Sequence, residues 1–287
     1  MKLLITTQAV DQEDPVLGFF HGWLLEFANH FERIDVICLK EGTHALPAHV
    51  FVHSLGKEKG VNYVRYVYRL FAYIWRLRMH YDVVFSHMNP HYIVLAGWLW
   101  ALQGKRMYFW RNHARMNVMT RVAACFARRV FYTSPYACTR VFPHAVQMPV
   151  GIDTQFFTPQ SIEPVPDSIL LLGRLSPVKR PEVYIATGAL LPRYTFDIYG
   201  DVPNGDHAYR STLEASATHN VHFCGAISHY ETPHVYARHA LYVNLTPEGS
   251  MDKTVLEAAA CGTLVLVSNT SYHGYIPEES LVSDGRP

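Results

Sequence analysis

The strongest constraint on the fold is a regular alternation of short apolar segments with longer segments of helical spacing. Alternating strands and helices predict a parallel, doubly wound α/β sheet. In the first half of the chain the expected strands are Leu3–Thr7, Ile34–Leu39, Val50–His53, Val83–Ser86, Met107–Trp110 and Val130–Thr133, and the expected helices are Leu17–Phe31, Val61–His80 and Met116–Ala127.

The alternation starts again after a stretch rich in proline and polar residues that ends at Asp167. We therefore predict two Rossmann-like domains, residues 1–150 and 168–287, joined by a linker over residues 151–167. The second domain is expected to be incomplete at its C-terminus, because a further helix would normally follow the probable strand at Leu281 and Val282, where the chain stops. Its expected strands are Ile169–Leu172, Thr195–Tyr199, Val221–Phe223, Ala240–Leu245 and Leu264–Val267, and its expected helices are Pro181–Leu191, Tyr209–Ala217, Tyr230–Arg238 and Asp252–Cys261.

Charge is divided unevenly between the two halves. Residues 1–150 contain 17 Lys/Arg and nine Asp/Glu, a net charge of +8, whereas residues 151–287 contain eight and 15, a net charge of −7. No carboxylate lies between Asp82 and Asp153. The basic half suits an anionic membrane surface, an anionic acceptor or nucleic acid. Because no motif that reads RNA or DNA is present, nucleic acid is not expected as a partner.

Cysteine use and hydropathy predict a cytoplasmic protein. The five cysteines are scattered and none is paired at C-x-x-C spacing, which is typical of reduced thiols. The longest apolar run, Tyr92 to Leu102, has 11 residues, whereas a membrane-spanning helix needs about 20. The N-terminus becomes polar too early for a signal peptide.

The first segment with chemical character follows the first strand of the second series. There Gly173 and Arg174 follow a buried strand, and Lys179 precedes a predicted helix. Ligands of open α/β sheets bind beyond the carboxyl ends of the strands, and helix N-termini there favour phosphate groups. An arginine and a lysine at this position predict an anion site, although two surface cations beside a turn would give the same pattern.

A second segment, residues 247–267, reads as strand end, loop of small residues, helix and glycine stop. Gly249 and Ser250 allow backbone amides to approach an anion where the helix starts. Glu257 lies further along the helix. Its carboxylate could accept hydrogen bonds from a ribose, or it could simply be a solvated helix residue.

Together the two segments resemble the group 1 (family 4) glycosyltransferases, which have the two-domain GT-B fold. The family pattern Gly-Arg-Leu-x-x-x-Lys is similar to residues 173–179, and Leu-Glu-Ala-x-Ala-Cys-Gly-x-x-Val is similar to residues 256–265. Residues 149–159 and 221–225 resemble two further family patterns. The similarity is strongest over residues 147–268.

The resemblance implies a retaining enzyme that moves a sugar from a nucleotide diphosphate sugar to a hydroxyl group of a glycan or lipid-linked acceptor. It implies no cofactor and no obligatory metal. Arg174 and Lys179 would bind the donor diphosphate, and Glu257 would hold the donor ribose. The other candidate donor-binding residues of this domain are Gly173, Glu248, Gly249, Ser250, Asp252, Lys253 and Thr254.

One position departs from the family pattern. The family places an acid eight residues before the ribose-binding glutamate, and here that position is Gly249. Glu248, the nearest acid, lies one residue earlier. Either the loop shifts by one residue, or this Gly-Ser-x-Asp-Lys variant contacts the sugar differently.

Candidates in the first domain follow predicted strand ends. In GT-B enzymes the loop after the first strand faces the cleft, so Gly18 is a candidate donor-binding residue. Asp11 and Asp14 could contact an acceptor or cap the next helix, and capping is favoured for Asp14. His113 is predicted as a catalytic residue, because residues 110–113 fit the family pattern aromatic-x-x-His better than His87 does. Chance placement is a rival explanation in a chain with 17 histidines.

A metal site is not expected, because the closely spaced histidine pairs have no acidic partner at ligand spacing. The helix Val61–His80 carries arginines near one face, apolar residues opposite, and aromatic residues between them. This composition is typical of a helix on an anionic membrane surface, which would make the protein peripheral on the inner face of the membrane. A Rossmann-type helix with a solvated basic face is the alternative.

Two other function classes remain for comparison. A non-catalytic or truncated sugar-nucleotide-binding protein would also explain the motifs and the abrupt end of the chain. An NAD-dependent oxidoreductase is disfavoured, because residues 6–10 contain no glycine and therefore no G-x-G-x-x-G turn after the first strand.

Overall fold

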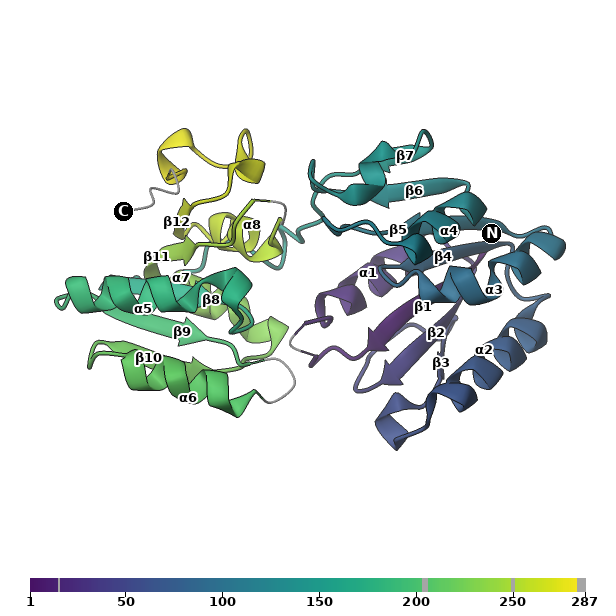
Figure 1. Ribbon diagram of the computed structural model, residues 1–287, viewed down its shortest axis with the longest axis horizontal. Coiled ribbons are helices and arrows are strands. Elements are labelled where there is room, and N and C mark those ends of the chain that lie inside the picture. Colours follow the sequence, from purple (N-terminus) through teal and green to yellow (C-terminus); the bar gives the residue numbers. More distant parts are fainter. Residues whose placement is uncertain (15, 203–205, 249–250, 283–287) are drawn as a thin grey trace. The chain divides into compact units, whose positions relative to one another are not determined.

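The computed structural model describes residues 1–14, 16–202, 206–248 and 251–282. The chain divides into two compact units, Met1–Met148 and Pro149–Pro287, and each unit is built around its own sheet (Figure 1). All neighbouring strands in both sheets are parallel. The predicted α/β class with two doubly wound sheets is therefore confirmed.

The first unit contains a seven-stranded sheet in the order β3-β2-β1-β4-β5-β6-β7. Its strands are β1 (Lys2–Val10), β2 (Arg33–Glu41), β3 (Val50–Ser54), β4 (Val83–His87), β5 (Arg106–Trp110), β6 (Arg129–Tyr132) and β7 (Ala145–Gln147). Its helices are α1 (Phe19–Ala28), α2 (Tyr63–Leu77), α3 (His91–Leu102) and α4 (Val118–Phe126), with short 3-10 helices η1 (Lys57–Lys59) and η2 (Cys138–Val141).

Separate apolar clusters cover the two faces of this sheet. One cluster contains Ile74 of α2, Trp100 of α3 and Ala123 of α4, all fully buried. The other contains Phe20 of α1. Successive side chains of a strand point to opposite faces, so the same strands contribute to both clusters. Helices α2, α3 and α4 therefore cover one face and α1 covers the other (Figure 1).

The second unit contains a five-stranded sheet in the order β10-β9-β8-β11-β12. Its strands are β8 (Val165–Leu172), β9 (Thr195–Tyr199), β10 (Val221–Gly225), β11 (His239–Asn244) and β12 (Leu264–Val267). Its helices are α5 (Pro181–Leu190), α6 (His207–Ser216), α7 (Thr232–Arg238) and α8 (Lys253–Ala260), with 3-10 helices η3 (Pro177–Lys179), η5 (His229–Glu231), η6 (Thr270–Tyr272) and η7 (Glu278–Ser280).

The packing of the second unit follows the same plan. Tyr184 of α5 and Leu213 of α6 belong to one buried cluster, and Tyr236 of α7 and Val255 of α8 belong to another. Strand β8 lies between β9 and β11, so the direction in which the chain winds changes at β8. In sheets of this type the loops that follow two such neighbouring strands diverge and leave room for a ligand.

Helix α3 and strand β7 were not among the expected elements. Helix α3 coincides with the longest apolar run, and its buried residues include Tyr92, Ile93, Ala96 and Trp100. The helix's own residues are apolar on nearly every face, so there is no polar stripe that would indicate helical spacing. Strand β8 begins at Val165, inside the segment that the sequence predicts as a linker.

Candidate active site

Two loops of the second unit meet beyond the carboxyl ends of β8 and β11. Lys179 ends η3, which follows β8, and Asp252 immediately precedes α8, which follows β11. Their side chains form an ion pair although 73 residues separate them, and the side-chain exposures are 15% and 19%. The structure thus brings together two of the predicted donor-binding residues at the point where the winding direction changes.

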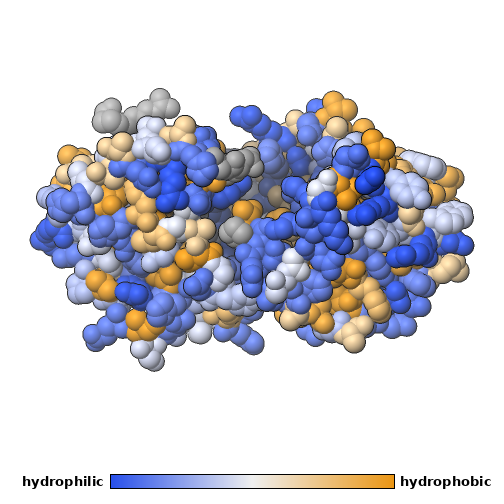
Figure 2. Space-filling model, turned by 90° about the horizontal axis from the view of Figure 1, so that it is seen from below, coloured by the Kyte–Doolittle hydropathy of each residue, from blue (hydrophilic) through white to orange (hydrophobic). Residues whose placement is uncertain are grey.

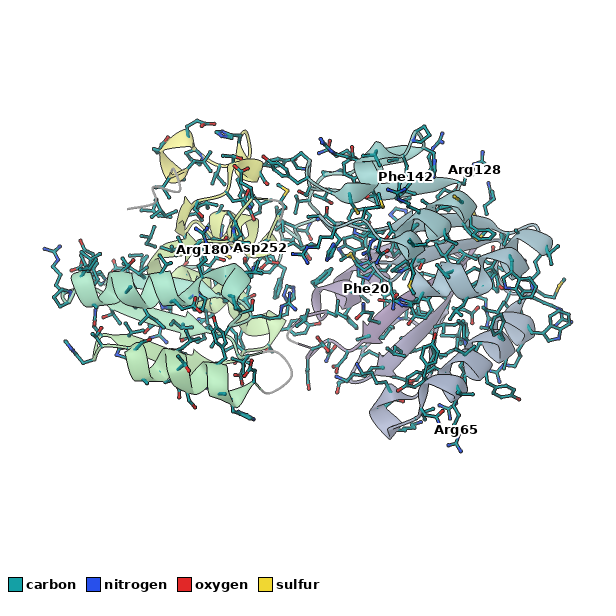
Figure 3. All side chains as sticks on the ribbon, viewed as in Figure 1. Phe20, Arg65, Arg128, Phe142, Arg180 and Asp252 are labelled. Atoms are coloured by element: carbon teal, nitrogen blue, oxygen red, sulfur yellow. The ribbon has the colours of Figure 1, made fainter. Side chains whose placement is uncertain are left out.

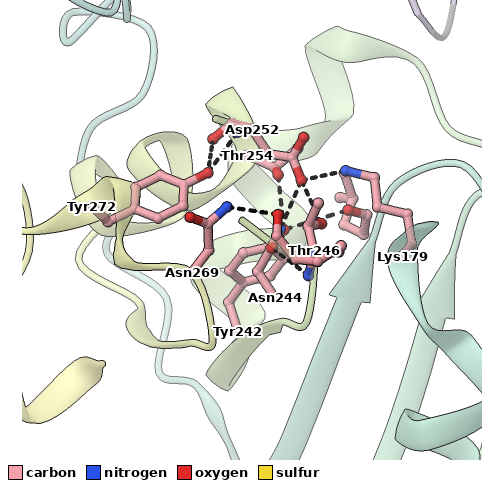
Figure 4. Close-up of polar contacts among 10 residues, drawn as sticks. Lys179, Tyr242, Asn244, Thr246, Asp252, Thr254, Asn269 and Tyr272 are labelled. Carbon is pink, nitrogen blue, oxygen red and sulfur yellow. Dashed lines mark hydrogen bonds and ion pairs between the residues drawn. The ribbon is translucent and has the colours of Figure 1, made fainter. Parts of the chain in front are cut away.

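The carboxylate of Asp252 is held by more than the lysine (Figure 4). Its Oδ2 also accepts hydrogen bonds from Asn244 Nδ2 at 3.1 Å and from Thr246 Oγ1 at 2.7 Å. Burial alone would raise the pKa of Asp252, but Lys179 and these two donors outweigh it and hold the pKa below its usual range. Asp252 is therefore a carboxylate at neutral pH.

Tyrosine side chains fix the backbone around this carboxylate. Tyr272 Oη accepts the Asp252 N–H and donates to the Asp252 carbonyl oxygen at 2.9 Å. Tyr242 Oη donates to Thr254 Oγ1 at 2.8 Å and accepts from Asn244 Nδ2 at 3.1 Å. The predicted residue Thr254 thus belongs to the same network. Sequence reasoning missed Asn244 and Thr246, although their position at the end of a predicted strand was a usable signal.

Arg174 lies in the turn after β8 and is exposed. No hydrogen bond or ion pair joins it to any residue that the structure describes. The turn itself depends on two glycines. Gly173 has φ +152°, and a Cβ atom on Gly200, which has φ +138°, would lie 1.9 Å from the Gly173 carbonyl oxygen. Only glycine at 200 allows the ends of β8 and β9 to approach this closely.

Glu257 is buried rather than solvated, with 5% of its surface exposed. Its Oε2 accepts a hydrogen bond from Tyr236 Oη at 3.1 Å. Burial raises the pKa of Glu257 to about 7, partly offset by the nearby Lys253 ammonium and by Tyr236. The solvated alternative considered for this residue is wrong, because α8 turns it toward the α7 side of the core.

Lys253 is the first residue of α8, and its side chain is largely enclosed by neighbouring groups. Its Nζ donates to the Gly151 carbonyl oxygen at 3.0 Å, and burial lowers its pKa to about 8. Burial also lowers the pKa of His229 to about 4, and the Lys253 charge adds to that shift. His229 stacks on Phe156 with ring centroids 5.8 Å apart. The rings of Phe156 and His229 therefore supply aromatic surface near the start of α8, where the amine of Lys253 is partly neutral.

Glu248 is exposed and accepts a hydrogen bond from Thr270 Oγ1 at 2.6 Å. Gly249 and Ser250 fall outside the described residues.

In the first unit, Gly18 has a packing role. A Cβ atom there would lie 2.7 Å from the Asp14 carbonyl oxygen and 2.8 Å from that of Gln12. Gly18 is itself the N-cap residue of α1. Asp14 does not cap that helix, so that expectation is wrong. Its Oδ1 instead accepts the Leu17 N–H at 2.9 Å and closes the preceding turn.

Asp11, in the same loop, is engaged by the Lys40 ammonium at 3.1 Å, which also lies 3.6 Å from Asp14. The two acids that follow β1 therefore share one cation from β2.

The two candidate histidines differ in their surroundings. His87, at the end of β4, is buried, stacks on Phe20 with centroids 4.0 Å apart, and lies 3.2 Å from Thr7 Oγ1 through Nδ1. His113, after β5, is exposed, and its Nδ1 accepts the Arg115 N–H at 2.9 Å. In the neutral ring of His113 the proton therefore lies on Nε2.

Sequence reasoning did not select Arg111, which contacts the residue after His87. Arg111, directly after β5, is 9% exposed and donates from Nη1 to the Met88 carbonyl oxygen at 2.9 Å.

Within the described residues, no three His, Cys, Asp or Glu side chains come together in an arrangement that could hold a metal ion. None of the described helices combines the length and apolar character needed to cross a bilayer.

Two parallel, doubly wound units are the architecture of the GT-B fold, and the second unit gathers a lysine and a helix start beyond its central strands. Residues 166–286 match the family described as "Glycosyl transferases group 1". The second unit is therefore a group 1 glycosyltransferase domain, and the chain is a glycosyltransferase. The expected family and activity are confirmed.

Solved structures show the same fold over nearly the whole chain. Anabaena Alr3699/HepE in complex with UDP and glucose has a TM-score of 0.75 at 16% identity, covering 97% of this chain and 83% of that one. Sucrose-phosphate synthase from Thermosynechococcus elongatus has a TM-score of 0.74 at 17% identity, covering 100% and 87%. TarM, a Staphylococcus aureus protein, has a TM-score of 0.76 at 8% identity, covering 100% and 89%. No curated protein matches the chain by sequence.

Proposed function

We propose that this glycosyltransferase takes its sugar from a nucleotide diphosphate sugar, and that Arg174 and Lys179 bind the donor diphosphate. The observation that carries the proposal is the position of Lys179 beyond the ends of β8 and β11, beside the start of α8. The amides at a helix start and a fixed ammonium together favour a phosphate ligand.

Arg174 supplies a second cation on the same loop. It is exposed and has no partner among the described residues, so its guanidinium can turn toward an incoming anion. A guanidinium can bind two phosphate oxygens at once, whereas an ammonium acts as a point charge. Both would stabilise the negative charge that develops on the leaving nucleoside diphosphate when the bond to the sugar breaks.

Glu257 is proposed to hold the donor ribose. A buried carboxyl group whose pKa is raised to about 7 exists in both protonation states near neutral pH. Either form can accept a hydrogen bond from a ribose hydroxyl. Tyr236 already orients the group from the α7 side.

The donor base is proposed to be uracil, because the structures of Alr3699/HepE and TarM contain UDP. The acceptor is proposed to be a glycan or a lipid-linked precursor, and the reaction to retain the anomeric configuration without an obligatory metal. Activity in the presence of EDTA and the configuration of the product test these last two points.

A thermal-shift panel with UDP, GDP and ADP tests the donor site. A ligand that binds only the folded protein raises the melting temperature by mass action. Arg174→Ala and Lys179→Ala should each lower turnover by about 10²–10³-fold. Arg174→Ala should leave the unliganded melting temperature near that of the wild type, whereas Lys179→Ala should also lower it, because the mostly buried Asp252 carboxylate loses its counter-ion. The matched control is Arg193→Ala, which removes an exposed arginine of the same unit. Wild-type turnover in both site variants would contradict the proposal.

We also propose that the first unit docks on an anionic lipid surface through the outer side of α2. Val64, Tyr68 and Trp75 recur at helical spacing on α2, Met79 follows in the turn after the helix, and 58–78% of each residue is exposed. Arg65 extends into solvent from the same helix (Figure 3). In Figure 2, which views the molecule from the side where α2 lies in Figure 1, hydrophobic residues lie among hydrophilic ones on this unit.

The neighbouring helix continues this surface. Trp98 and Leu102 of α3 are 50% and 79% exposed, and the rings of Trp98 and Phe71 of α2 lie 6.3 Å apart. No carboxylate occurs on α2, α3 or α4. Exposed aromatic residues combined with arginines favour the interface of an anionic bilayer.

Flotation with vesicles that contain phosphatidylserine tests this docking. The wild type should float with these vesicles and not with neutral phosphatidylcholine vesicles. The double variant Tyr68→Ala/Trp75→Ala should float less, whereas Leu190→Ala, which removes an exposed apolar residue of the second unit, should behave like the wild type. Absence of wild-type flotation would remove the membrane proposal and leave the donor site untouched.

A further inference from the structure

The conformation of Asp252 is unusual for its position. It is the N-cap residue of α8, with φ −79° and ψ +129°, yet its side chain makes no capping hydrogen bond. An aspartate at an N-cap normally accepts an N–H of the first helical turn. Here the carboxylate turns away from its own helix and toward Lys179 (Figure 4).

The carboxylate is fixed in that direction by groups from three parts of the unit. Lys179 comes from the loop after β8, Asn244 from the end of β11, and Thr246 from the loop that follows β11, and all three donate to the same oxygen, Oδ2. Tyr272 holds the Asp252 backbone from both its N–H and its carbonyl group. An aspartate held this firmly cannot leave the lysine without breaking several contacts.

We propose that Asp252 is the counter-ion of Lys179: its carboxylate positions the ammonium before the donor binds and competes with the donor diphosphate for it. The inference rests on the proposed function, in which Lys179 binds that diphosphate. A mostly buried ammonium without a partner is unfavourable, so Lys179 needs a carboxylate at this place when no anion is bound to it. The same carboxylate opposes any second anion that approaches the lysine.

The competition has a consequence for turnover. When the nucleoside diphosphate leaves after sugar transfer, Asp252 regains the ammonium, which favours release of the product. Asp252 thereby weakens product binding and keeps Lys179 oriented for the next donor. It is a positioning residue, because it acts through Lys179.

The experiment measures binding of inorganic pyrophosphate and of UDP by calorimetry. Asp252→Asn retains the size and the hydrogen-bonding capacity of the side chain but removes its charge, so both ligands should bind about tenfold more tightly, equivalent to 1.4 kcal/mol. The control Asp167→Asn makes the same change of net charge at a half-exposed position of the second unit and should leave both affinities within twofold. If Asp252→Asn does not fold, Asp252→Ser, which removes the same charge, takes its place in the experiment.

A second variant separates this inference from the proposed function. In the Lys179→Met background, Asp252→Asn should no longer tighten binding, because the group for which the anions compete is absent. In kinetics, Asp252→Asn should lower both KM for the donor and kcat, as expected when product is retained, whereas a purely structural role would lower the melting temperature and leave both constants unchanged.

Two results would overturn the counter-ion role: unchanged affinity in Asp252→Asn, or a gain in affinity that persists in the Lys179→Met background. If Lys179→Met alone fails to weaken binding of pyrophosphate, the assignment of the diphosphate site fails instead.

Discussion

The Tyr236 hydroxyl donates a hydrogen bond to the Glu257 carboxyl group at 3.1 Å, from α7 to α8, and both side chains are buried. A glutamate in this environment is a weaker acid than an exposed glutamate. Burial raises its pKa to about 7 from a usual value near 4.5, although Lys253 and Tyr236 act in the opposite direction. The residue proposed to bind ribose therefore titrates close to neutral pH.

This titration predicts a pH dependence of stability. Between pH 4.5 and 7 the folded protein keeps a proton that the unfolded chain has lost, so the free energy of unfolding should fall as pH rises through this window. Glu257→Gln cannot titrate and should show a smaller fall. Urea unfolding at pH 5, 6, 7 and 8 measures the difference, with the exposed Glu279→Gln as the control. Parallel pH profiles of wild type and Glu257→Gln would contradict the burial of this charge.

A second prediction concerns Asp35 in the core of the first unit. Its fully buried carboxylate accepts hydrogen bonds from Arg33 Nε at 2.8 Å and from His53 Nε2 at 2.8 Å. Burial alone would raise the pKa of Asp35, but His53 and Arg33 together hold it below its usual range. Asp35→Asn leaves Arg33 partly unpaired and should lower the free energy of unfolding by about 3 kcal/mol at pH 7.

The sign of the pH effect follows from the lowered pKa of Asp35. Its contribution is present above the pKa of an unfolded aspartate, near 4, and is lost as pH falls through the lower folded value. The difference between wild type and Asp35→Asn should therefore shrink below about pH 4. Glu32→Gln, which removes an exposed acid of the same unit, is the control. A constant difference down to pH 2 would contradict the assignment of an ionised Asp35.

The third prediction tests the close approach of β8 and β9. A methyl group at Gly200 would meet the Gly173 carbonyl oxygen at 1.9 Å, in a backbone conformation with φ +138°. Gly200→Ala should cost about 1–3 kcal/mol in strain alone and should displace the turn that carries Arg174, so UDP binding should weaken as well. Gly274→Ala is the matched control, because Gly274 also has a positive φ, +76°, but open space around it. Equal effects of the two substitutions on UDP affinity would contradict this role of Gly200.

Much of the fold was predictable because alternating parallel strands and helices leave a strong periodic pattern. Helix α3 was missed because its own residues are apolar on nearly every face, which leaves no helical alternation of polar and apolar residues. Asp14 was taken for a helix cap, since local sequence does not reveal that Gly18 starts α1 and that the carboxylate closes the turn before it.

The candidate donor site was predicted one loop at a time. Sequence spacing located Lys179 and Asp252 at separate loops after predicted strands, but only the strand order β9-β8-β11 places those loops side by side. The burial of Glu257 was not predictable either. An isolated glutamate on a helix is usually solvated, and its core-facing orientation depends on how α8 packs on α7.

The last prediction concerns the two histidines at strand ends of the first unit. His87 stacks on Phe20 and lies within hydrogen-bond distance of Thr7, so His87→Ala should open a cavity and lower the free energy of unfolding by about 2 kcal/mol or more. His113 is exposed, so His113→Ala should leave stability nearly unchanged.

Turnover should respond in a way that stability does not. If the His113 ring exchanges a proton with a reacting group or orients the sugar through Nε2, His113→Ala should lower kcat by about 10²-fold or more. His113→Gln, which places an amide N–H near the position of Nε2, should recover part of the rate if the contact is a hydrogen bond and none if the ring must accept a proton. Full activity of His113→Ala with a normal melting temperature would exclude His113 as the catalytic histidine. Because His87 is the other histidine at a strand end of this unit, turnover per folded molecule of His87→Ala would then be the next measurement.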